Sequence, residues 1–211
     1  MPSLKFTREE FSARIAKTRA AMAEADIELA IVSDPSNMNW LTGYDGWSFY
    51  THQAVLLAME GEPVWWGRGM DALGAKLTVF MDPSNIVGYP DHYVQTPERH
   101  PMQTLADLLK ARGWETLRCG VEMDNYYFSA AAWETLKREL PQTSFTDVTA
   151  LVNWQRAVKS PTEIEYMRRA ARIVETMHSK ILEVAEPGMP KNELVADIYH
   201  ASIMGADGHW G

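Results

Sequence analysis

The chain opens with a helical pattern of apolar and polar positions. One face carries apolar or weakly polar side chains at helical spacing, and its positions are Phe11, Ile15, Thr18 and Met22. That spacing predicts an amphipathic helix. Thr7, followed three residues later by Glu10, has the pattern of a capping box and predicts where this helix begins.

Short apolar runs farther along the chain predict the strands of a sheet. Residues 29–33, LAIVS, predict a buried strand that the turn-forming residues DPSN should end. Residues 54–60 and 64–68 are apolar runs joined by a short connection that contains glycine, so they predict a hairpin. The runs at 117–122 and 144–148 predict two further strands.

Helical patterns separate these runs. Residues 70–80 predict a short helix, and residues 101–112 carry leucines at helical spacing before a glycine stop signal. Ser129 opens another helix, which a proline ends. Residues 85–101 are punctuated by glycine, proline and histidine and predict a mostly irregular segment. Repeated strand and helix units indicate an α/β fold, in which the hairpin makes the sheet mixed.

Residues 37–52, NMNWLTGYDGWSFYTH, break the alternation that an ordinary core strand would show. They hold five large aromatic side chains around two glycines and are expected to form a loop. Local sequence leaves two interpretations open. The aromatic side chains either wedge a turn against the core or line a small-molecule pocket.

After the last predicted strand, the chain shows only helical patterns. Ser160, Pro161 and Glu163 form a helix start, and one apolar face then continues to the Pro-Gly pair at 187–188. A second helix is predicted at about 191–204. Two such helices need a sheet or a further helix pair to pack against. We therefore expect this chain to be the N-terminal part of a longer protein.

Composition and charge exclude several classes of protein. With 28 acidic and 20 basic side chains the net charge is −8, so no general attraction to nucleic acid or to an anionic membrane is expected. No run approaches the ~18 apolar residues of a spanning helix, and the start lacks the apolar region of a signal peptide. The single Cys119 excludes an intramolecular disulfide or a multi-cysteine zinc site, fits a cytoplasmic protein and is expected to be a buried apolar residue.

Three segments resemble the creatinase, prolidase and aminopeptidase P superfamily. RAVKSPTEIEYMRRAARIVETMH at 156–178, followed by EPGMPKNEL, is similar to the start of the family's catalytic domain. NWLTGY at 39–44 is similar to a Tyr-Leu-Thr-Gly-Phe type motif of its N-terminal domain. The resemblance implies a creatinase-like α/β domain at 1–155, with a mixed sheet flanked by helices. It implies that residues 156–211 form the first two helices of a truncated "pita-bread" α+β catalytic domain.

The resemblance also implies an activity. Four segments most resemble a branch of the superfamily that hydrolyses a C–N bond of a cyclic amidine, and they span 34–53, 88–102, 124–132 and 153–175. A small-molecule substrate and a homodimer are therefore expected. Two alternatives stay open: a metal-dependent Xaa-Pro dipeptidase or aminopeptidase, and a non-catalytic creatinase-like binding module.

The catalytic residues implied by this resemblance would lie downstream of Gly211, and the chain alone is expected to be inactive. Peptidase members of the superfamily hold a dinuclear divalent metal through two aspartates, a histidine and two glutamates, and other members work without metal. None of these ligands can be assigned to a residue of this chain. A metal cofactor is therefore expected only if the downstream ligands are present.

The resemblance gives the aromatic stretch a functional interpretation, because dimerisation in the superfamily brings one subunit's N-terminal domain over the other's active site. Aromatic faces would bind an amidinium ring well, so residues 45–52 are expected to form a lid, while Trp40 and Leu41 anchor the turn to the core. Asp91 and His92 join an acid to an imidazole that can move protons, the alternative being a turn-stabilising Asp91. The candidate substrate-binding residues are Trp47, Tyr50, His52, Asp91 and His92.

Other histidines and a serine were weighed as well. His209, in a Gly-flanked loop after the last predicted helix, is a candidate ligand contact or proton donor. Arg99 and His100 would either contact a substrate carboxylate or lie in a solvated loop. His178 and His200 lie on predicted helices without a second ligand at i+4, so both are expected to be structural or surface residues. Ser160 is expected to cap a helix rather than to act as a nucleophile.

Overall fold

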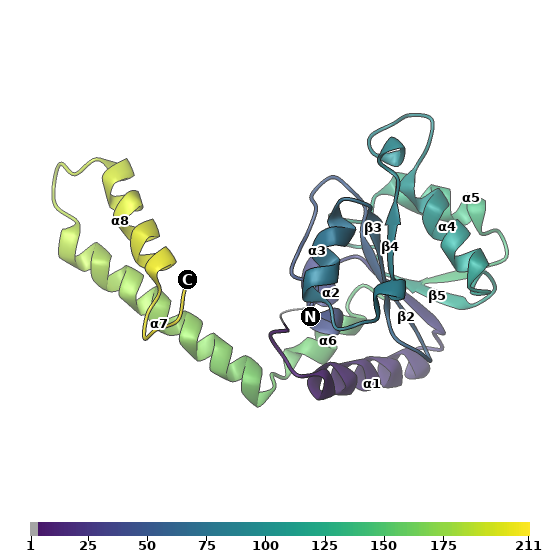
Figure 1. Cartoon of the computed structure of the whole chain (residues 1–211), viewed down its shortest axis with the longest axis horizontal. Coiled ribbons are helices and arrows are strands. Elements are labelled where there is room, and N and C mark those ends of the chain that lie inside the picture. The colour runs from purple at the N-terminus through teal and green to yellow at the C-terminus, as the bar shows by residue number, and fades with distance from the viewer. Residues whose placement is uncertain (1–3) are drawn as a thin grey trace. The chain divides into compact units, whose positions relative to one another are not determined.

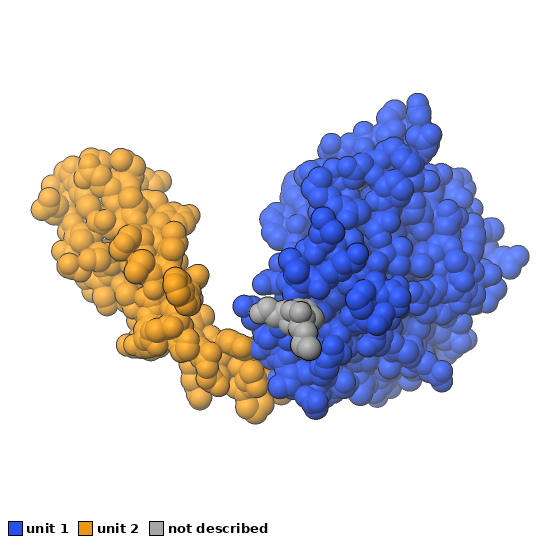
Figure 2. Space-filling model, in the orientation of Figure 1, with its two compact units in different colours: residues 1–157 blue, residues 158–211 orange. Residues whose placement is uncertain are grey.

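The computed structural model of the chain describes residues 4–211 and divides into two compact units, Met1–Ala157 and Val158–Gly211 (Figure 2). The strands of the first unit form one sheet, and the second unit is a pair of helices. No helix within the described residues is long and apolar enough to cross a membrane.

A six-stranded mixed sheet forms the centre of the first unit, in the order β4-β3-β2-β1-β5-β6 (Figure 1). The strands are β1 (Leu29–Val32), β2 (Ala54–Ala58), β3 (Val64–Arg68), β4 (Ile86–Tyr89), β5 (Arg118–Val121) and β6 (Ser144–Asp147). β2 pairs antiparallel with β1 and β3, and the remaining neighbours are parallel. The predicted hairpin and the mixed α/β sheet are confirmed.

Helices cover both faces of the sheet (Figure 1). One face packs on α1 (Arg8–Glu24), α2 (Pro35–Thr42), α3 (Asp71–Thr78) and α6 (Leu151–Ala157), and the other on α4 (Pro101–Ala111) and α5 (Ala130–Glu139). Successive side chains of a strand point to opposite faces. Leu29 and Ile31 therefore join the core beneath α4 and α5, while Ala30 and Val32 join the other core. Cys119 is fully buried, as expected.

Helix α1 confirms the first prediction. The Thr7 hydroxyl accepts a hydrogen bond from the Glu10 backbone N–H at 3.2 Å, and the predicted apolar face is buried. Arg14 is buried as well; its guanidinium donates to the Trp40 carbonyl at 3.1 Å and to the Glu10 carboxylate at 2.7 Å. The pattern did not indicate this residue, because arginine is rarely buried unless it is paired.

The prediction of a loop across 37–52 is wrong for its first part, because residues Pro35–Thr42 form helix α2. The segment DPSN starts this helix: the Asp34 side chain accepts a hydrogen bond from the Asn37 N–H at 3.0 Å, and proline stands in the first turn. Gly43 ends the helix with a φ of +83°, in the left-handed region. Trp40 and Leu41 are buried, so their predicted place in the core is confirmed.

The prediction that residues 85–101 are mostly irregular misses strand β4. This strand pairs parallel with β3 at the edge of the sheet, and only Tyr89 of its four residues is buried. A half-exposed edge strand has no continuous apolar run, so the pattern of the segment was too weak to reveal it. Two short 3-10 turns, Pro83–Asn85 and Asp91–Tyr93, flank the strand.

The second unit consists of α7 (Pro161–Val184) and α8 (Lys191–Met204), which pack against each other. The Ser160 hydroxyl accepts from the Glu163 N–H at 3.1 Å, and the Glu163 carboxylate accepts from the Ser160 N–H at 2.7 Å. The predicted capping role of Ser160 is confirmed. Helix α6, which precedes this unit, was not predicted, because its seven residues are too few to establish a periodic face.

Candidate functional site

Two loops of the first unit bring three aromatic side chains together, the exposed Trp47 and Phe49 and the half-buried Tyr127, here called the aromatic cluster. The Trp47 ring centroid lies 6.3 Å from that of Phe49 and 6.4 Å from that of Tyr127, with interplanar angles of 87° and 80°. Such edge-to-face pairs contribute about 0.5–1.5 kcal/mol each. Trp47 is nevertheless 61% exposed and Phe49 74% exposed. The cluster is ordered by its own contacts and still presents aromatic surface to solvent.

A buried polar network holds the loop that carries Tyr127. The Asn125 side-chain oxygen accepts from the Tyr127 N–H at 2.8 Å, and its amide nitrogen donates to the Ser33 hydroxyl at 3.0 Å. The Glu122 carboxylate accepts from the backbone N–H groups of Ser33 and Asp34 at 2.7 and 2.8 Å. These hydrogen bonds join the end of β5 to the start of α2. The two loops that carry the aromatic cluster follow these elements, so both loops are supported by the same hydrogen-bond network.

Glu122 is the most deeply placed carboxyl of this network. Burial raises the pKa of Glu122 to about 7, against the hydrogen bonds from Asp34, Asn37 and Ser33, which lower it. The nearby Asp34 charge also raises the pKa. The ionisation of Glu122 is therefore linked to the packing of the hydrogen-bond network beneath the aromatic loops.

A pocket of about 200 Å³ lies beside the aromatic cluster. Its walls come from the residues after the aromatic stretch and from the segment between β4 and α4, and they include Tyr50, His52, Tyr89, Tyr93, Arg99 and His100. The His52 and His100 ring centroids are 4.8 Å apart. The Tyr89 hydroxyl donates to the His52 carbonyl at 2.9 Å and fixes this wall. We call this cavity the two-histidine pocket.

Burial favours the neutral form of both histidines of this pocket. Burial lowers the pKa of His52, and the hydrogen bond to the Tyr127 carbonyl opposes this effect. Burial also lowers the pKa of His100, to about 4, and the electrostatic interactions with His52 and Arg138 lower it further. Neutral imidazole rings can each offer one donor and one acceptor.

The structure brings only part of the predicted site together. Tyr50 and His52 line the two-histidine pocket, and Trp47 lies in the neighbouring aromatic cluster. Asp91 instead forms a two-contact ion pair with Arg68, at 2.8 and 3.1 Å, which lowers the Asp91 pKa. This contact favours the structural alternative for Asp91. The substrate-binding roles of all five residues stay predictions.

Two predicted histidines outside this pocket are exposed. The His92 ring lies against Tyr93 at an interplanar angle of 33°, with centroids 4.7 Å apart. His209 lies in the second unit, where its backbone N–H donates to the Ala206 carbonyl at 2.8 Å. His178 and His200 are also exposed, in agreement with the expectation of surface residues.

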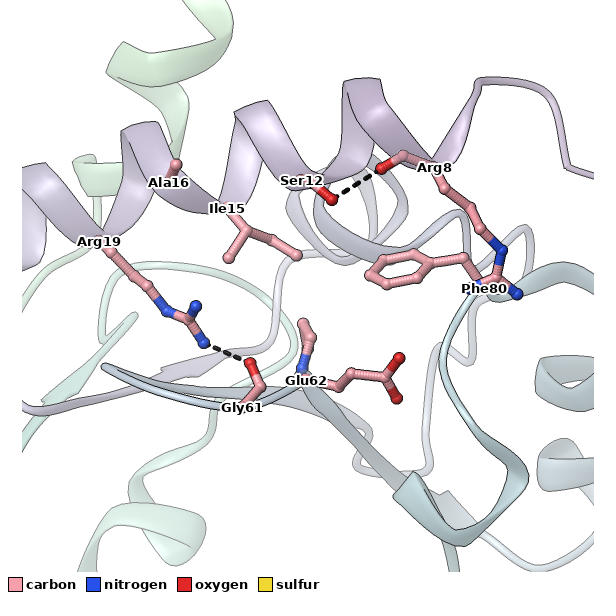
Figure 3. Close-up of a pocket in the computed structure, with 9 residues that line it drawn as sticks. Arg8, Ser12, Ile15, Ala16, Arg19, Gly61, Glu62 and Phe80 are labelled. Carbon is pink, nitrogen blue, oxygen red and sulfur yellow. Dashed lines mark hydrogen bonds between the residues drawn. The ribbon is translucent and has the colours of Figure 1, made fainter.

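A second hollow of about 400 Å³ lies between α1 and the β2–β3 turn (Figure 3). Ile15 and Phe80 form apolar walls. Arg19 donates to the Gly61 carbonyl at 2.5 Å, and the Glu62 carboxylate accepts from the Asp82 N–H at 2.8 Å. Both charged side chains thus secure turns, so a structural role explains the hollow better than a ligand site.

The described residues 4–211 offer no group of three or more His, Cys, Asp or Glu side chains that could hold a metal ion. The dinuclear metal of the peptidase members therefore does not fit the residues described, and no chemical step is derived through it.

Sequence reasoning assigned no role to Tyr127 and did not pair His100 with His52. Tyr127 lies in DNYYFSAAA, a segment that carried the family resemblance but no assigned role. His100 was interpreted as part of a solvated loop or as a carboxylate contact. A histidine directly before Pro101 at the start of a helical pattern was the available signal, because that position is a helix N-cap.

Comparison with known proteins gives this geometry its context. Residues 14–158 match the Creatinase/Prolidase N-terminal domain. The chain is 61% identical to the ectoine hydrolase of Halomonas elongata over 96% of this chain and 51% of that protein. It is 25% identical to the creatinase of a Bacillus species over 90% of this chain and 44% of that protein. The chain thus spans about half the length of these relatives.

Solved structures share the fold. The prolidase of Thermococcus sibiricus has a TM-score of 0.72 at 20% sequence identity. The matched region covers 93% of this chain and 51% of the prolidase chain. The Xaa-Pro dipeptidase of Bacillus anthracis has a TM-score of 0.70 at 18% sequence identity. The matched region covers 90% of this chain and 48% of the dipeptidase chain. Identities this low support the common fold and carry no argument about substrate.

Proposed function

Because the chain belongs to the Creatinase/Prolidase N-terminal domain family, we propose that it is part of a hydrolase that opens the cyclic amidine of ectoine to N-acetyl-2,4-diaminobutyrate. The observation that carries this proposal is the 61% identity to ectoine hydrolase over 204 residues. The alignment behind this identity covers 96% of the chain.

The proposed reaction is a hydrolysis. Water adds to the amidine carbon, one ring C–N bond breaks, and the released nitrogen leaves as an amine while the carbon becomes an amide carbonyl. The reaction needs a base for the water and a hydrogen-bonding group for the developing tetrahedral centre. We assign both tasks to residues in the part of these relatives that this chain does not cover. The chain alone is therefore proposed to be inactive.

The proposed part of this chain in the reaction is substrate recognition. Trp47 presents an aromatic face, and cation–π contact with an amidinium ring is worth ~0.5–2 kcal/mol. Its 61% exposure supports a role at a surface that a second subunit covers. We propose a homodimer in which the aromatic cluster of one subunit closes the active site of the other and excludes water from it.

A metal-dependent Xaa-Pro dipeptidase is the second candidate. It is favoured by the fold shared with the Bacillus anthracis Xaa-Pro dipeptidase, at a TM-score of 0.70. It ranks below ectoine hydrolysis because that relative is only 18% identical, against 61% for the ectoine hydrolase.

The proposed function is tested by comparing substrates on the full-length gene product, with the 211-residue chain as a second sample. We expect the full-length protein to consume ectoine with a kcat/KM at least a hundredfold above that for Ala-Pro, and the chain alone to consume neither. Preference for Ala-Pro would favour the dipeptidase. Turnover of neither substrate by a folded full-length dimer would favour a binding module.

A further inference from the structure

The two histidines of the pocket are held in opposite tautomers by backbone groups. The His100 Nδ1 accepts a hydrogen bond from the Met102 N–H at 3.2 Å, as the N-cap of α4. An N–H can donate only to an unprotonated nitrogen, so the single proton of the neutral His100 ring lies on Nε2. A reciprocal bond fixes this arrangement, because the backbone N–H of His100 donates to the Gln103 side-chain oxygen at 3.0 Å.

His52 has the opposite arrangement. Its Nδ1 lies 3.2 Å from the Tyr127 carbonyl oxygen. A carbonyl can only accept, so the proton of the neutral His52 ring lies on Nδ1 and its Nε2 carries a lone pair. Within the described residues, neither Nε2 atom has a hydrogen-bond partner. One ring thus retains a donor and the other an acceptor, and both rings line the same pocket.

The spacing of the rings limits the group that can use this pair. Their centroids are 4.8 Å apart with an interplanar angle of 44°. With the rings this close, we infer that a group that pairs with both presents its donor and its acceptor side by side on one edge. A primary carboxamide does so, whereas a trans secondary amide points its N–H and C=O in opposite directions. An amidinium offers only N–H donors and leaves the His100 donor without a partner.

The volume and charge of the pocket define the rest of the ligand. At about 200 Å³ the pocket is smaller than the ~300–1,000 Å³ of sites for drug-sized ligands, so it suits a molecule of few atoms. Arg99 lines the pocket and is 46% exposed, in loose contact with Glu98 at 3.5 Å. A carboxylate can form charge-assisted hydrogen bonds with this guanidinium.

We propose that the two-histidine pocket is a binding site for a small carboxamide that also carries a carboxylate. The carboxamide N–H donates to the His52 Nε2, its carbonyl accepts from the His100 Nε2, and the carboxylate meets Arg99. The lowered pKa values of both histidines support this arrangement, because protonation of His52 would remove the acceptor. The argument for this binding site does not rest on the proposed hydrolysis.

The first test reads the tautomers directly. Ring nitrogen NMR shifts of the 211-residue chain at pH 7 should identify His52 as the Nδ1–H form and His100 as the Nε2–H form. Titration should then give saturable shifts of both rings with succinamate as the probe. Succinate, which replaces the carboxamide by a second carboxylate, and N-acetylglycine, a secondary amide, should bind at least about tenfold more weakly, as expected for the loss of one well-paired buried group.

Two variants remove one Nε2 each and keep the backbone contact. In His100→Asn the amide oxygen can still cap α4, because asparagine is a good N-cap. In His52→Asn the amide N–H can still donate to Tyr127. Each should weaken succinamate binding about tenfold, while His178→Asn in the second unit, a surface control, should not change it.

Several results would overturn the proposal: identical tautomers in the two rings, equal affinity for succinamate and succinate, shifts centred on another surface, or no saturable binding. Ectoine turnover by the full-length protein has no part in these readouts. The failure of either proposal is therefore distinguishable from that of the other.

Discussion

The Glu122 carboxylate accepts a hydrogen bond from the Asn37 side-chain amide at 2.6 Å, which joins the end of β5 to the first turn of α2. The same Asn37 amide donates to the Asn153 side chain at 2.7 Å, and the Asn37 oxygen accepts from Arg156 at 2.6 Å. One partly buried cluster therefore ties together α2, β5 and α6. Since buried polar groups are costly when left unpaired, we expect this cluster to govern stability.

The Glu122 carboxyl should make stability depend on pH in an unusual direction. Its pKa is raised from the ordinary 4.5 to about 7 in the folded state, so between these values the folded chain binds more protons than the unfolded chain. Stability from this group is therefore largest below pH 4.5 and falls as the pH rises through 7, by up to about 3 kcal/mol.

Glu122→Gln tests this prediction, because glutamine retains an acceptor oxygen but does not ionise. Urea unfolding of wild type and variant at pH 5 and pH 8 should show a difference in free energy that grows in favour of the variant as the pH rises. The difference between wild type and variant cancels the contributions of other titratable groups to stability. His100 is one such group, and its lowered pKa makes stability rise with pH. A difference that does not change with pH would show that Glu122 is ionised across the whole interval.

Trp47→Ala should lower the kcat/KM of the full-length protein for ectoine by roughly threefold to thirtyfold, the equivalent of a cation–π contact of ~0.5–2 kcal/mol. The protein should stay folded with only a small fall in melting temperature, because Trp47 is mostly exposed and its loss removes only the two edge-to-face contacts of the cluster. Trp47→Phe is the matched control and should retain most of the activity through its ring. Equal activity of all three proteins would assign the aromatic cluster to structure alone.

Gly43→Ala should destabilise the first unit by about 1–2 kcal/mol, because the residue has a φ of +83° and an added Cβ would lie 2.9 Å from the Thr78 carbonyl oxygen. Gly74→Ala is the control: it lies inside α3, where an added Cβ meets nothing within 4 Å. That variant should be neutral or stabilised by up to about 1 kcal/mol. Thermal unfolding of both variants checks the pair, and an unaltered Gly43→Ala would contradict the requirement for a left-handed cap.

Much of the first unit follows from local patterns that the structure confirms. The capping residues Thr7, Ser129 and Ser160 all begin the helices that were predicted from them. The apolar runs of β1 and β2 are buried along their whole length, which is why their pattern was unambiguous. These elements obey rules that operate within a few residues of sequence.

The elements that were not predicted depend on more distant contacts. Strand β4 is defined by its pairing with β3, and α6 is short. Tyr127 joins the aromatic cluster only because a loop 80 positions from Trp47 folds beside it. The opposite tautomers of His52 and His100 depend on the Tyr127 carbonyl and the Met102 N–H, and a sequence pattern does not specify such partners.

The proposed hydrolysis of ectoine by the full-length protein is tested most directly by mass spectrometry of the product formed in water labelled with heavy oxygen. Addition of water to the amidine carbon predicts N-acetyl-2,4-diaminobutyrate that carries one labelled oxygen in its amide. Unchanged ectoine, or a product without the label, would contradict the account.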